Sequence, residues 1–266
     1  MQLSFTLSTE HPSLPGHFPG QPMAPAALLL DEVAHRFSLA TGLKVNTVKH
    51  VRFMAPLLPS QQLDVEYQPK TAAEYRFIGT VKGNPVLKGA LDYTAPEPKY
   101  VPFEQSLNGH SAHVSTPIAD IRDCYRRLPH SGDMRLLQHL LYCSEQSIVC
   151  QAGVQQPHPL SRQHKLPAWA SLEYAAQALA CHGLLTLSAV ASAANAAADP
   201  ASFRHAMIIG IRELSCQQEF IHPYQPCHIE VQLQAQQPQA ASCIFRLSQN
   251  GQPVSNGQFN VVYAAK

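Results

Sequence analysis

The chain has 266 residues, which fits one large domain or two domains of about 100–150 residues. Its hydrophobic fraction is 45% and its charged fraction only 14%, a composition that argues against a disordered chain. The formal net charge of +1 argues against a nucleic-acid binder, which usually carries a basic excess. We expect so low a charge to reflect surface buried against another subunit or another half of the same chain.

The sequence predicts a cytoplasmic protein without a membrane span. No apolar run reaches the ~20 residues that a membrane helix needs. The N-terminus lacks the basic head and apolar stretch of a signal peptide. The seven cysteines form no CxxC pair, and no His/Cys group has metal-ligand spacing, so we expect reduced thiols and no bound metal.

The first half predicts one long helix followed by antiparallel strands. The helix begins at Pro25, where a missing N–H is tolerated, and ends near Gly42, with apolar residues at helical spacing between them. Gly83–Asn84 marks a turn between two strands. The predicted strands alternate apolar and polar residues and cover 63–67, 74–81 and 86–93.

The second half predicts the same order of elements. Pro167 opens a helix that we expect from Ala168 to about Leu187. Asn250–Gly251 marks the corresponding turn. The predicted strands cover 229–234, 242–248 and 257–263.

These two halves are an internal repeat. MAPAALLLDEVAHRF (23–37) aligns with KLPAWASLEYAAQAL (165–179), so that Asp31 meets Glu173, 142 residues later. Farther along, the strand and turn motifs align at offsets of 166 and 168, which leaves about 24 to 26 extra residues in the second copy. We expect them as a helix extension and loop in the Ala-rich stretch 188–202.

The repeat predicts two α+β units in one chain. We expect an N-terminal unit over 1–95, a Pro- and Ser-containing linker over 96–117 and a C-terminal unit over 118–266. A helix wrapped by one sheet leaves an edge and an apolar face, and two such units can bury both by pairing about a pseudo-twofold axis.

One motif in the first half suggests chemistry. In GHFPG (16–20), two glycines permit a tight backbone that would present the imidazole of His17, and Asp31 follows on the helix. A histidine and a carboxylate facing one apolar tunnel would suit paired base and acid work. The alternative interpretation is a loop histidine and a helix-surface aspartate without chemistry.

The longer string GHFPGQPMAPAALLLDEVA resembles the signature H-F-P-G-x-P-x-x-P-G-x-L-x-x-(E/D) of β-hydroxyacyl-[acyl-carrier-protein] dehydratases of the hotdog fold. Ala26 departs from it, because the family usually has Gly there. LPHSGDMRLL and LPAWASLEYAAQALACHG resemble the companion dehydratase subunit of aryl polyene pigment pathways, and the first half resembles the small dehydratase of those pathways. The resemblance implies a double hotdog, an α+β pseudo-dimer within one chain.

In that family the site lies at the dimer interface, so the resemblance implies a histidine from one unit and an acid from the helix of the other. The first composite site pairs His17 with Glu173, which Gln177 follows in an E-x-x-x-Q pattern. The second pairs Asp31 with His158, and we expect it to be degenerate because QPHPLS stands in place of HFPG.

The expected reaction removes water from a 3-hydroxyacyl thioester. Neutral His17 takes the α-proton, and protonated Glu173, its pKa raised by burial, gives a proton to the leaving hydroxyl. A backbone N–H near Gly20 or Ala168 is expected to bind the enolate oxygen, and Gln177 the substrate. His130 is expected to have a structural role outside the site.

We expect an acyl carrier protein as partner, with the substrate on its phosphopantetheine and no other cofactor. Two further functions stay open: a hotdog thioesterase, whose helix acid activates water, and a non-catalytic acyl-binding double hotdog. The sequence determines neither the acyl length nor whether the fused units pair further into a homo-oligomer. Two small basic groups would meet the acidic carrier or be merely solvated: Arg122, Arg126 and Arg127, and Lys44, Lys49 and Arg52.

Overall fold

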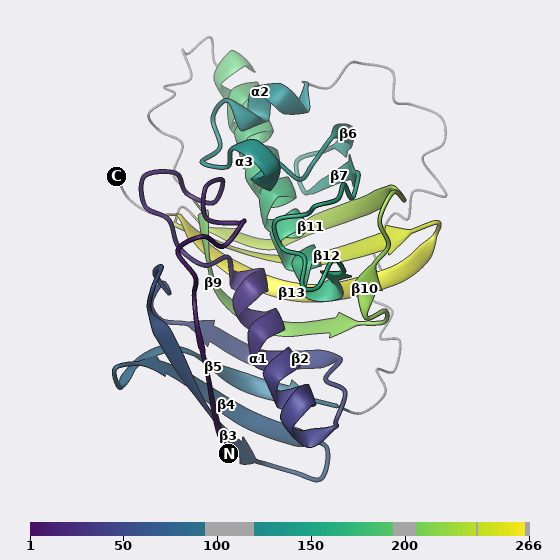
Figure 1. The fold of residues 1–266 in the computed structure, drawn as a ribbon. Coiled ribbons are helices and arrows are strands. Elements are labelled where there is room, and N and C mark those ends of the chain that lie inside the picture. Colours follow the sequence, from purple (N-terminus) through teal and green to yellow (C-terminus); the bar gives the residue numbers. More distant parts are fainter. Residues whose placement is uncertain (94–119, 194–205, 238, 264–266) are drawn as a thin grey trace.

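The computed structural model describes residues 1–93, 120–193, 206–237 and 239–263, with side chains of the last helix described as far as residue 186. Within them, one antiparallel sheet of eleven strands lies behind two long helices (Figure 1). The elements of the first half are β1 (Gln2–Thr6), α1 (Ala26–Thr41), β2 (Thr47–Phe53), β3 (Gln62–Pro69), β4 (Glu74–Val81) and β5 (Asn84–Asp92).

The second half repeats this arrangement with additions. The short helix α2 precedes the long helix α3, and the two-residue strands β8 and β10 form a separate small ladder. The bounds are α2 (Ile121–Tyr125), β6 (His139–Cys143), β7 (Ser147–Ala152), β8 (Leu166–Pro167), α3 (Ser171–Ala193), β9 (Ala206–Cys216), β10 (Phe220–Ile221), β11 (Cys227–Gln237), β12 (Ala240–Gln249) and β13 (Gln252–Tyr263).

The predicted helices and the six predicted strands are confirmed, with small differences at their ends. α1 starts directly after Pro25 and ends at Gly42, whose positive φ of 74° lets its N–H reach the carbonyl of Ser38 at 2.8 Å. α3 begins after a 3-10 turn over Ala168–Ala170 and extends beyond the predicted Leu187.

The two halves join at the middle of the sheet. The strand order is β1-β3-β4-β5-β2-β9-β13-β12-β11-β7-β6, so β2 and β9 pair at the seam. Going outward, β5, β4, β3 and β1 correspond to β13, β12, β11 and β7, and β6 is an additional edge strand of the second half. The buried hydroxyls of Thr47 and Ser215 meet across this seam at 3.0 Å. Leu30 and Leu172, at equivalent positions of the two helices, are completely buried in one shared core. The predicted pseudo-dimer is therefore confirmed.

Two expectations concern residues that the structure does not describe. The predicted linker over 96–117 lies within 94–119, outside the described residues. Of the Ala-rich stretch 188–202, α3 includes the residues up to Ala193, and 194–205 lie outside the described residues. Among the helices that are described, none has the length and apolar character needed to cross a membrane.

Candidate active site

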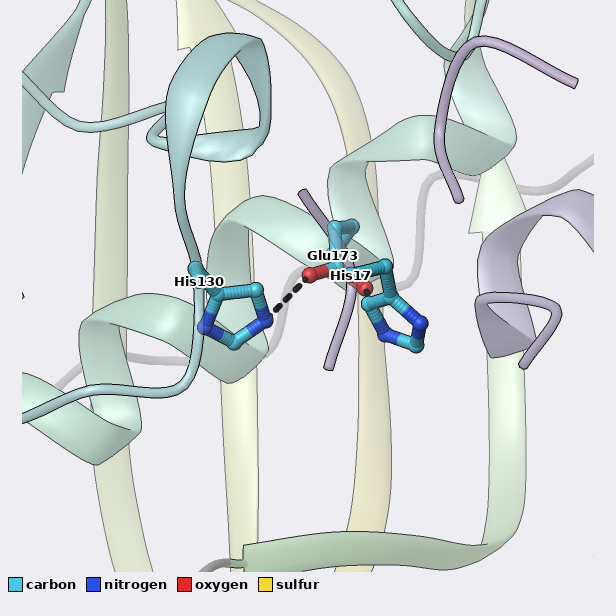
Figure 2. Close-up of side chains that lie close together, drawn as sticks. All are labelled: His17, His130 and Glu173. Atoms are coloured by element: carbon cyan, nitrogen blue, oxygen red, sulfur yellow. Dashed lines mark ion pairs between the residues drawn. The ribbon is translucent and has the colours of Figure 1, made fainter. Parts of the chain in front are cut away.

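Three side chains from distant parts of the sequence meet between the two halves (Figure 2). His17 lies on the loop that leads to α1, His130 on the loop after α2, and Glu173 in the first turn of α3. The Nε2 atom of His17 is 4.0 Å from Oε2 of Glu173, and Nε2 of His130 is 3.1 Å from Oε1 of the same carboxylate. All three residues are buried, with exposed fractions of 6%, 8% and 3%. The predicted juxtaposition of His17 and Glu173 is therefore present.

A glycine brings the two histidine loops together. The Ser131 N–H donates to the Gly16 carbonyl at 3.0 Å, and His17 and His130 pair as an isolated antiparallel bridge. A Cβ atom on Gly16 would lie only 2.2 Å from the Ser131 carbonyl oxygen. Phe18 adopts a positive φ of 56°, which is uncommon for a residue with a side chain. The loop of the first half is thus shaped to fit the loop of the second.

The contacts of His17 prepare it to accept a proton. Its Nδ1 lies 2.9 Å from the Met23 carbonyl, which can only accept a hydrogen bond. The proton of the neutral ring is therefore on Nδ1, and the lone pair of Nε2 faces Glu173. Burial lowers the pKa of His17, and the nearby Glu173 carboxylate offsets part of that effect. The ring is accordingly neutral near pH 7, as a general base requires.

The environment of Glu173 differs from the expected one. Burial by itself raises the pKa of Glu173, but the hydrogen bond from His130, the electrostatic influence of the two neighbouring imidazoles and the hydrogen bond from Gln177 outweigh it and lower the pKa to about 2. The prediction that burial keeps this carboxyl protonated is therefore wrong. The structure surrounds the carboxylate with donors that favour its ionised form.

Gln177 holds Glu173 in position and has no free group left for a substrate. Its amide nitrogen donates to Oε1 of Glu173 and to the Met134 carbonyl, each at 2.9 Å. Its oxygen accepts from the Tyr125 hydroxyl at 2.7 Å and from the Leu136 N–H at 3.2 Å. Gln177 is fully buried, so its predicted contact with substrate is replaced by a positioning role.

The two expected oxyanion donors are also placed differently. The Ala168 N–H donates to the Glu219 carbonyl at 2.9 Å and is not available. Gly20 is exposed and does not line the cavity beside His17. Ala26 does line it, as the first residue of α1. N–H groups in a first helical turn have no acceptor within their helix, so the start of α1 offers the donors that the expected positions do not.

A cavity of about 270 Å³ opens beside the two histidines and the carboxylate. The groups that line it are mostly apolar and come from both halves, including the seam strands β2 and β9. Its apolar lining includes Phe18, Met23, Leu29, Phe53, Met54, Leu57, Leu128, Ala176, Ala180, Met207, Ile208 and Ile209. Such a lining suits a hydrocarbon chain with one polar end at the histidines.

The predicted second site does not assemble. Asp31 forms an ion pair with Arg162, at 2.9 Å from Nε and 3.3 Å from Nη2, and Nη1 of Arg162 is 3.3 Å from Nε2 of His35. Burial raises the pKa of Asp31, and its hydrogen bond to Arg162 offsets part of the rise. The expected pairing of Asp31 with His158 is therefore wrong, because an arginine occupies the carboxylate.

His158 has other partners within its own half. Its Nδ1 accepts from the Leu160 N–H at 3.1 Å, so the proton of the neutral ring is on Nε2, 3.1 Å from the Tyr174 hydroxyl. Burial lowers the pKa of His158 to about 4, an effect that the Glu173 charge partly offsets. The ring is a buried neutral group, and both of its nitrogens have hydrogen-bond partners. The second site is therefore not only degenerate, as expected, but is not formed at all.

Replacing Asp31 with Asn should affect dehydration far less than replacing Glu173 with Gln. We expect kcat within about threefold of the wild type, because Asp31 lies outside the cavity that His17 lines. Removing one partner of a buried pair destabilises by about 3–5 kcal/mol at most, and the exposed part of Arg162 reduces that cost. Steady-state kinetics and urea unfolding of the same preparation measure both effects. If the Asp31 variant lost as much activity as the Glu173 variant, Asp31 would have a catalytic role, in contradiction to this prediction.

His130 is the site residue that the sequence did not predict. The motif LPHSG was expected to lie outside the site because in the resembling families it precedes the first strand. In the structure, Gly16 draws that motif against the GHFPG loop, and its imidazole reaches Glu173. A histidine directly before a tight Ser-Gly turn is the only signal in the sequence, and it does not specify the partner loop.

Two imidazoles and a carboxylate are also donor types that divalent transition metals accept. Ligand atoms of His17, His130 and Glu173 all lie within 4.8 Å of one another. Spacing along the chain predicted no metal site, but spacing does not detect a cluster assembled from three distant segments. A test of function on this chain therefore needs a chelator control.

The fold and the histidine–glutamate pair between its halves define a class, that of double-hotdog dehydratase domains. The dehydratase domain of RzxB from Pseudomonas fluorescens aligns over 98% of this chain and 93% of its own, with 14% identity and a TM-score of 0.73. The dehydratase domain of PpsC from Mycobacterium tuberculosis, in complex with C12:1-CoA, aligns over 99% and 93%, with 10% identity and a TM-score of 0.72. At these identities the likeness shows the fold, and it confirms the predicted double hotdog.

The sequence identifies the family. Residues 123–266 match the family described as ApeP-like, ApeP dehydratase, and residues 1–89 match the family described as ApeI-like, ApeI dehydratase. The chain therefore belongs to the ApeP-like dehydratases and carries an ApeI-like dehydratase unit in its first half. The dehydratase heterocomplex ApeI:P from Xenorhabdus doucetiae is 23% identical over 54% of this chain and 91% of that chain, with a TM-score of 0.45.

Proposed function

We propose that this dehydratase removes water from a 3-hydroxyacyl thioester on the phosphopantetheine of an acyl carrier protein and releases a trans-2-enoyl thioester, in aryl polyene or fatty-acid-like synthesis. One observation carries the proposal: a neutral, oriented His17 faces Glu173 across 4.0 Å at the polar end of an apolar cavity. No cofactor beyond the carrier's arm enters this reaction.

The elimination needs a base, an acid and a group that stabilises negative charge. Nε2 of His17 takes the α-proton, and the developing enolate oxygen accepts hydrogen bonds from N–H groups at the start of α1, near Ala26. The Cβ–O bond then breaks, the double bond forms, and a proton from the Glu173 side of the site joins the hydroxyl to give water. His17 in the first half is the base, and the Glu173 side of the site, in the second half, provides the proton for the leaving hydroxyl.

An acyl thioester fits the shape of the cavity. Glu173, Ala176 and Ala180 line it at helical spacing on α3, a rise of about 10 Å along the helix. The PpsC domain, which shares this fold, binds C12:1-CoA, itself an acyl thioester. We infer that the acyl chain lies along these two alanines with its thioester near His17.

Replacing Ala180 with Phe should shorten the usable cavity. We expect kcat/KM for long 3-hydroxyacyl substrates to fall about 10- to 100-fold, while the shortest substrates change by less than threefold. The ratio between chain lengths, measured on one preparation, is its own control against misfolding. A uniform loss at all lengths would place the acyl chain elsewhere.

The surface that binds the carrier protein is also a proposal. The two basic groups are partly neutralised by neighbours: Arg122 pairs with Asp120 and Lys49 with Asp92, at 2.7 and 2.6 Å. Lys44 pairs with Glu219 at 2.8 Å. An acidic carrier therefore has to compete with these local acids, and binding should weaken as salt concentration rises.

The decisive experiment incubates the full chain with 3-hydroxyacyl carrier proteins of several chain lengths, with and without a chelator. Loss of 18 Da from the carrier-bound acyl group, unaffected by the chelator, supports the proposal. Release of free acid would instead indicate the thioesterase. Carrier binding without turnover at any length would indicate a non-catalytic acyl-binding protein, and loss of activity on chelation would assign the His–His–Glu cluster to a metal.

A further inference from the structure

His130 has no assigned role in the reaction, yet it makes the closest contact with the Glu173 carboxylate. Its Nε2 lies 3.1 Å from Oε1 of Glu173, and its side chain is 9% exposed. Its Nδ1 is buried and has no hydrogen-bond partner in the described part of the chain. Since a carboxylate can only accept, Nε2 of His130 carries a proton that points at Glu173.

This contact matters because the leaving hydroxyl needs a proton. Glu173 is held in its ionised form by hydrogen bonds from two donors, His130 and Gln177, and an ionised carboxylate has no proton to give. The amide of Gln177 donates a hydrogen bond but does not release its proton. His17 has to be neutral in order to take the α-proton. In the described part of the chain, His130 is the remaining group with a hydrogen-bond contact to the carboxylate.

We propose that His130 stores the proton that reaches the leaving hydroxyl, so that a His130–Glu173 pair, and not the carboxyl alone, is the acid of this dehydratase. The inference rests on the proposed function and assigns a further residue to it. His130 also lines the cavity, so its imidazole is beside the space where the substrate would lie.

The protons and charges balance through the step. Before reaction, His17 is neutral, and His130 and Glu173 together hold one proton more than a neutral imidazole and a carboxylate. His17 takes the α-proton, the electron pair forms the double bond, and the C–O bond breaks. The shared proton passes to the leaving oxygen. The site then holds protonated His17, neutral His130 and ionised Glu173, and transfer of a proton from His17 back to the pair restores it.

The groups that face His130 favour this storage. Glu173 on α3 supplies a negative charge at 3.1 Å, and the neutral ring of His17 lies 5.7 Å away between ring centroids. Phe18 packs an aromatic ring 5.8 Å from the imidazole. Arg135 adds a positive charge nearby, but its Nε donates to the His130 carbonyl at 3.3 Å and not to the ring. Among the residues that the structure describes, the charged group in contact with the ring is the Glu173 carboxylate.

The test replaces His130 with Gln, whose amide can donate to Glu173 from about the same place but carries no transferable proton. We expect kcat for dehydration to fall about 100-fold or more, with KM within threefold and Glu173 unmoved in a crystal structure. The matched control is His182→Gln, which changes another buried histidine, bonded to the Ser144 carbonyl at 2.8 Å and outside the cavity lining. Its kcat should stay within threefold of the wild type.

A second readout needs no turnover. Carbon-13 NMR of the Glu173 carboxyl in the full chain should show its pKa rising in His130→Gln, because the positive charge beside it is lost. A variant with near wild-type kcat, or an unchanged Glu173 titration, would overturn the inference and leave His130 a structural role. If the wild type dehydrates no substrate, the proposed function fails, and the titration still decides whether the pair shares a proton.

Discussion

Replacing Glu173 with Gln in the full chain lowers kcat for dehydration by about three orders of magnitude, within the 10²–10⁴ that general acid–base groups contribute. Gln has nearly the same shape and can keep contacts with Gln177 and His130, so the fold and the cavity remain. The variant lacks the negative charge that holds a proton on its neighbour. Single-turnover assays by mass spectrometry measure the loss directly.

The matched change in the other half is His17→Asn, and it should cause a loss of similar size. Asn can still donate to the Met23 carbonyl, which Nδ1 of His17 contacts at 2.9 Å, but it cannot take a proton. Circular dichroism of both variants should match the wild type. Retention of more than a tenth of the activity by both variants would show that the reaction does not pass through this pair.

Replacing Gly16 with Ala reduces stability and activity together. The added Cβ would meet the Ser131 carbonyl at 2.2 Å, so the two histidine loops have to separate. We expect the free energy of unfolding to fall by about 1–3 kcal/mol, the usual cost of overpacking. Activity should fall at least 10-fold, because His17 and His130 lie on the separated loops. Urea unfolding and kinetics of the same preparation measure both.

The same substitution at Gly183 is the control. This glycine lies within α3, and a Cβ there would meet no atom of the described residues within 4 Å. Alanine should therefore stabilise the helix by about 0.5–1 kcal/mol and leave activity unchanged. If Gly16→Ala behaved like Gly183→Ala, the close contact between the loops would not be what shapes the site.

The repeated motifs predicted most of the fold because they depend on local signals. Helix starts at proline, a glycine cap and alternating strands each involve neighbouring residues, and the internal repeat indicates the pairing of two units. β9 was not predicted, although it forms half of the seam. Its register shifts around Ile211 and again near Ile208, so its apolar residues do not alternate regularly.

The site was predictable only as far as the resemblance extended. His17 and Glu173 belong to recognisable motifs, and the structure places them together. The role of His130 depends on how two loops pack. The Ala168 N–H cannot bind a substrate because it donates to the carbonyl of Glu219, which is distant in the sequence. The ionisation of Glu173 depends on hydrogen bonds from His130, on a distant loop, and from Gln177 on its own helix. These are tertiary contacts, which single-sequence patterns do not contain.

The continuous seam between β2 and β9 has a consequence for how the enzyme responds to dilution. In an enzyme built from separate subunits, the fraction of assembled sites falls as concentration drops below the dissociation constant. Here each chain holds both halves of its site, so the effective concentration of one half around the other does not depend on how many chains are present. Specific activity should therefore be constant over dilution. Because the two halves are permanently joined, one working site per chain is sufficient. The carboxylate at the equivalent position of the first half, Asp31, can therefore form a structural ion pair with Arg162.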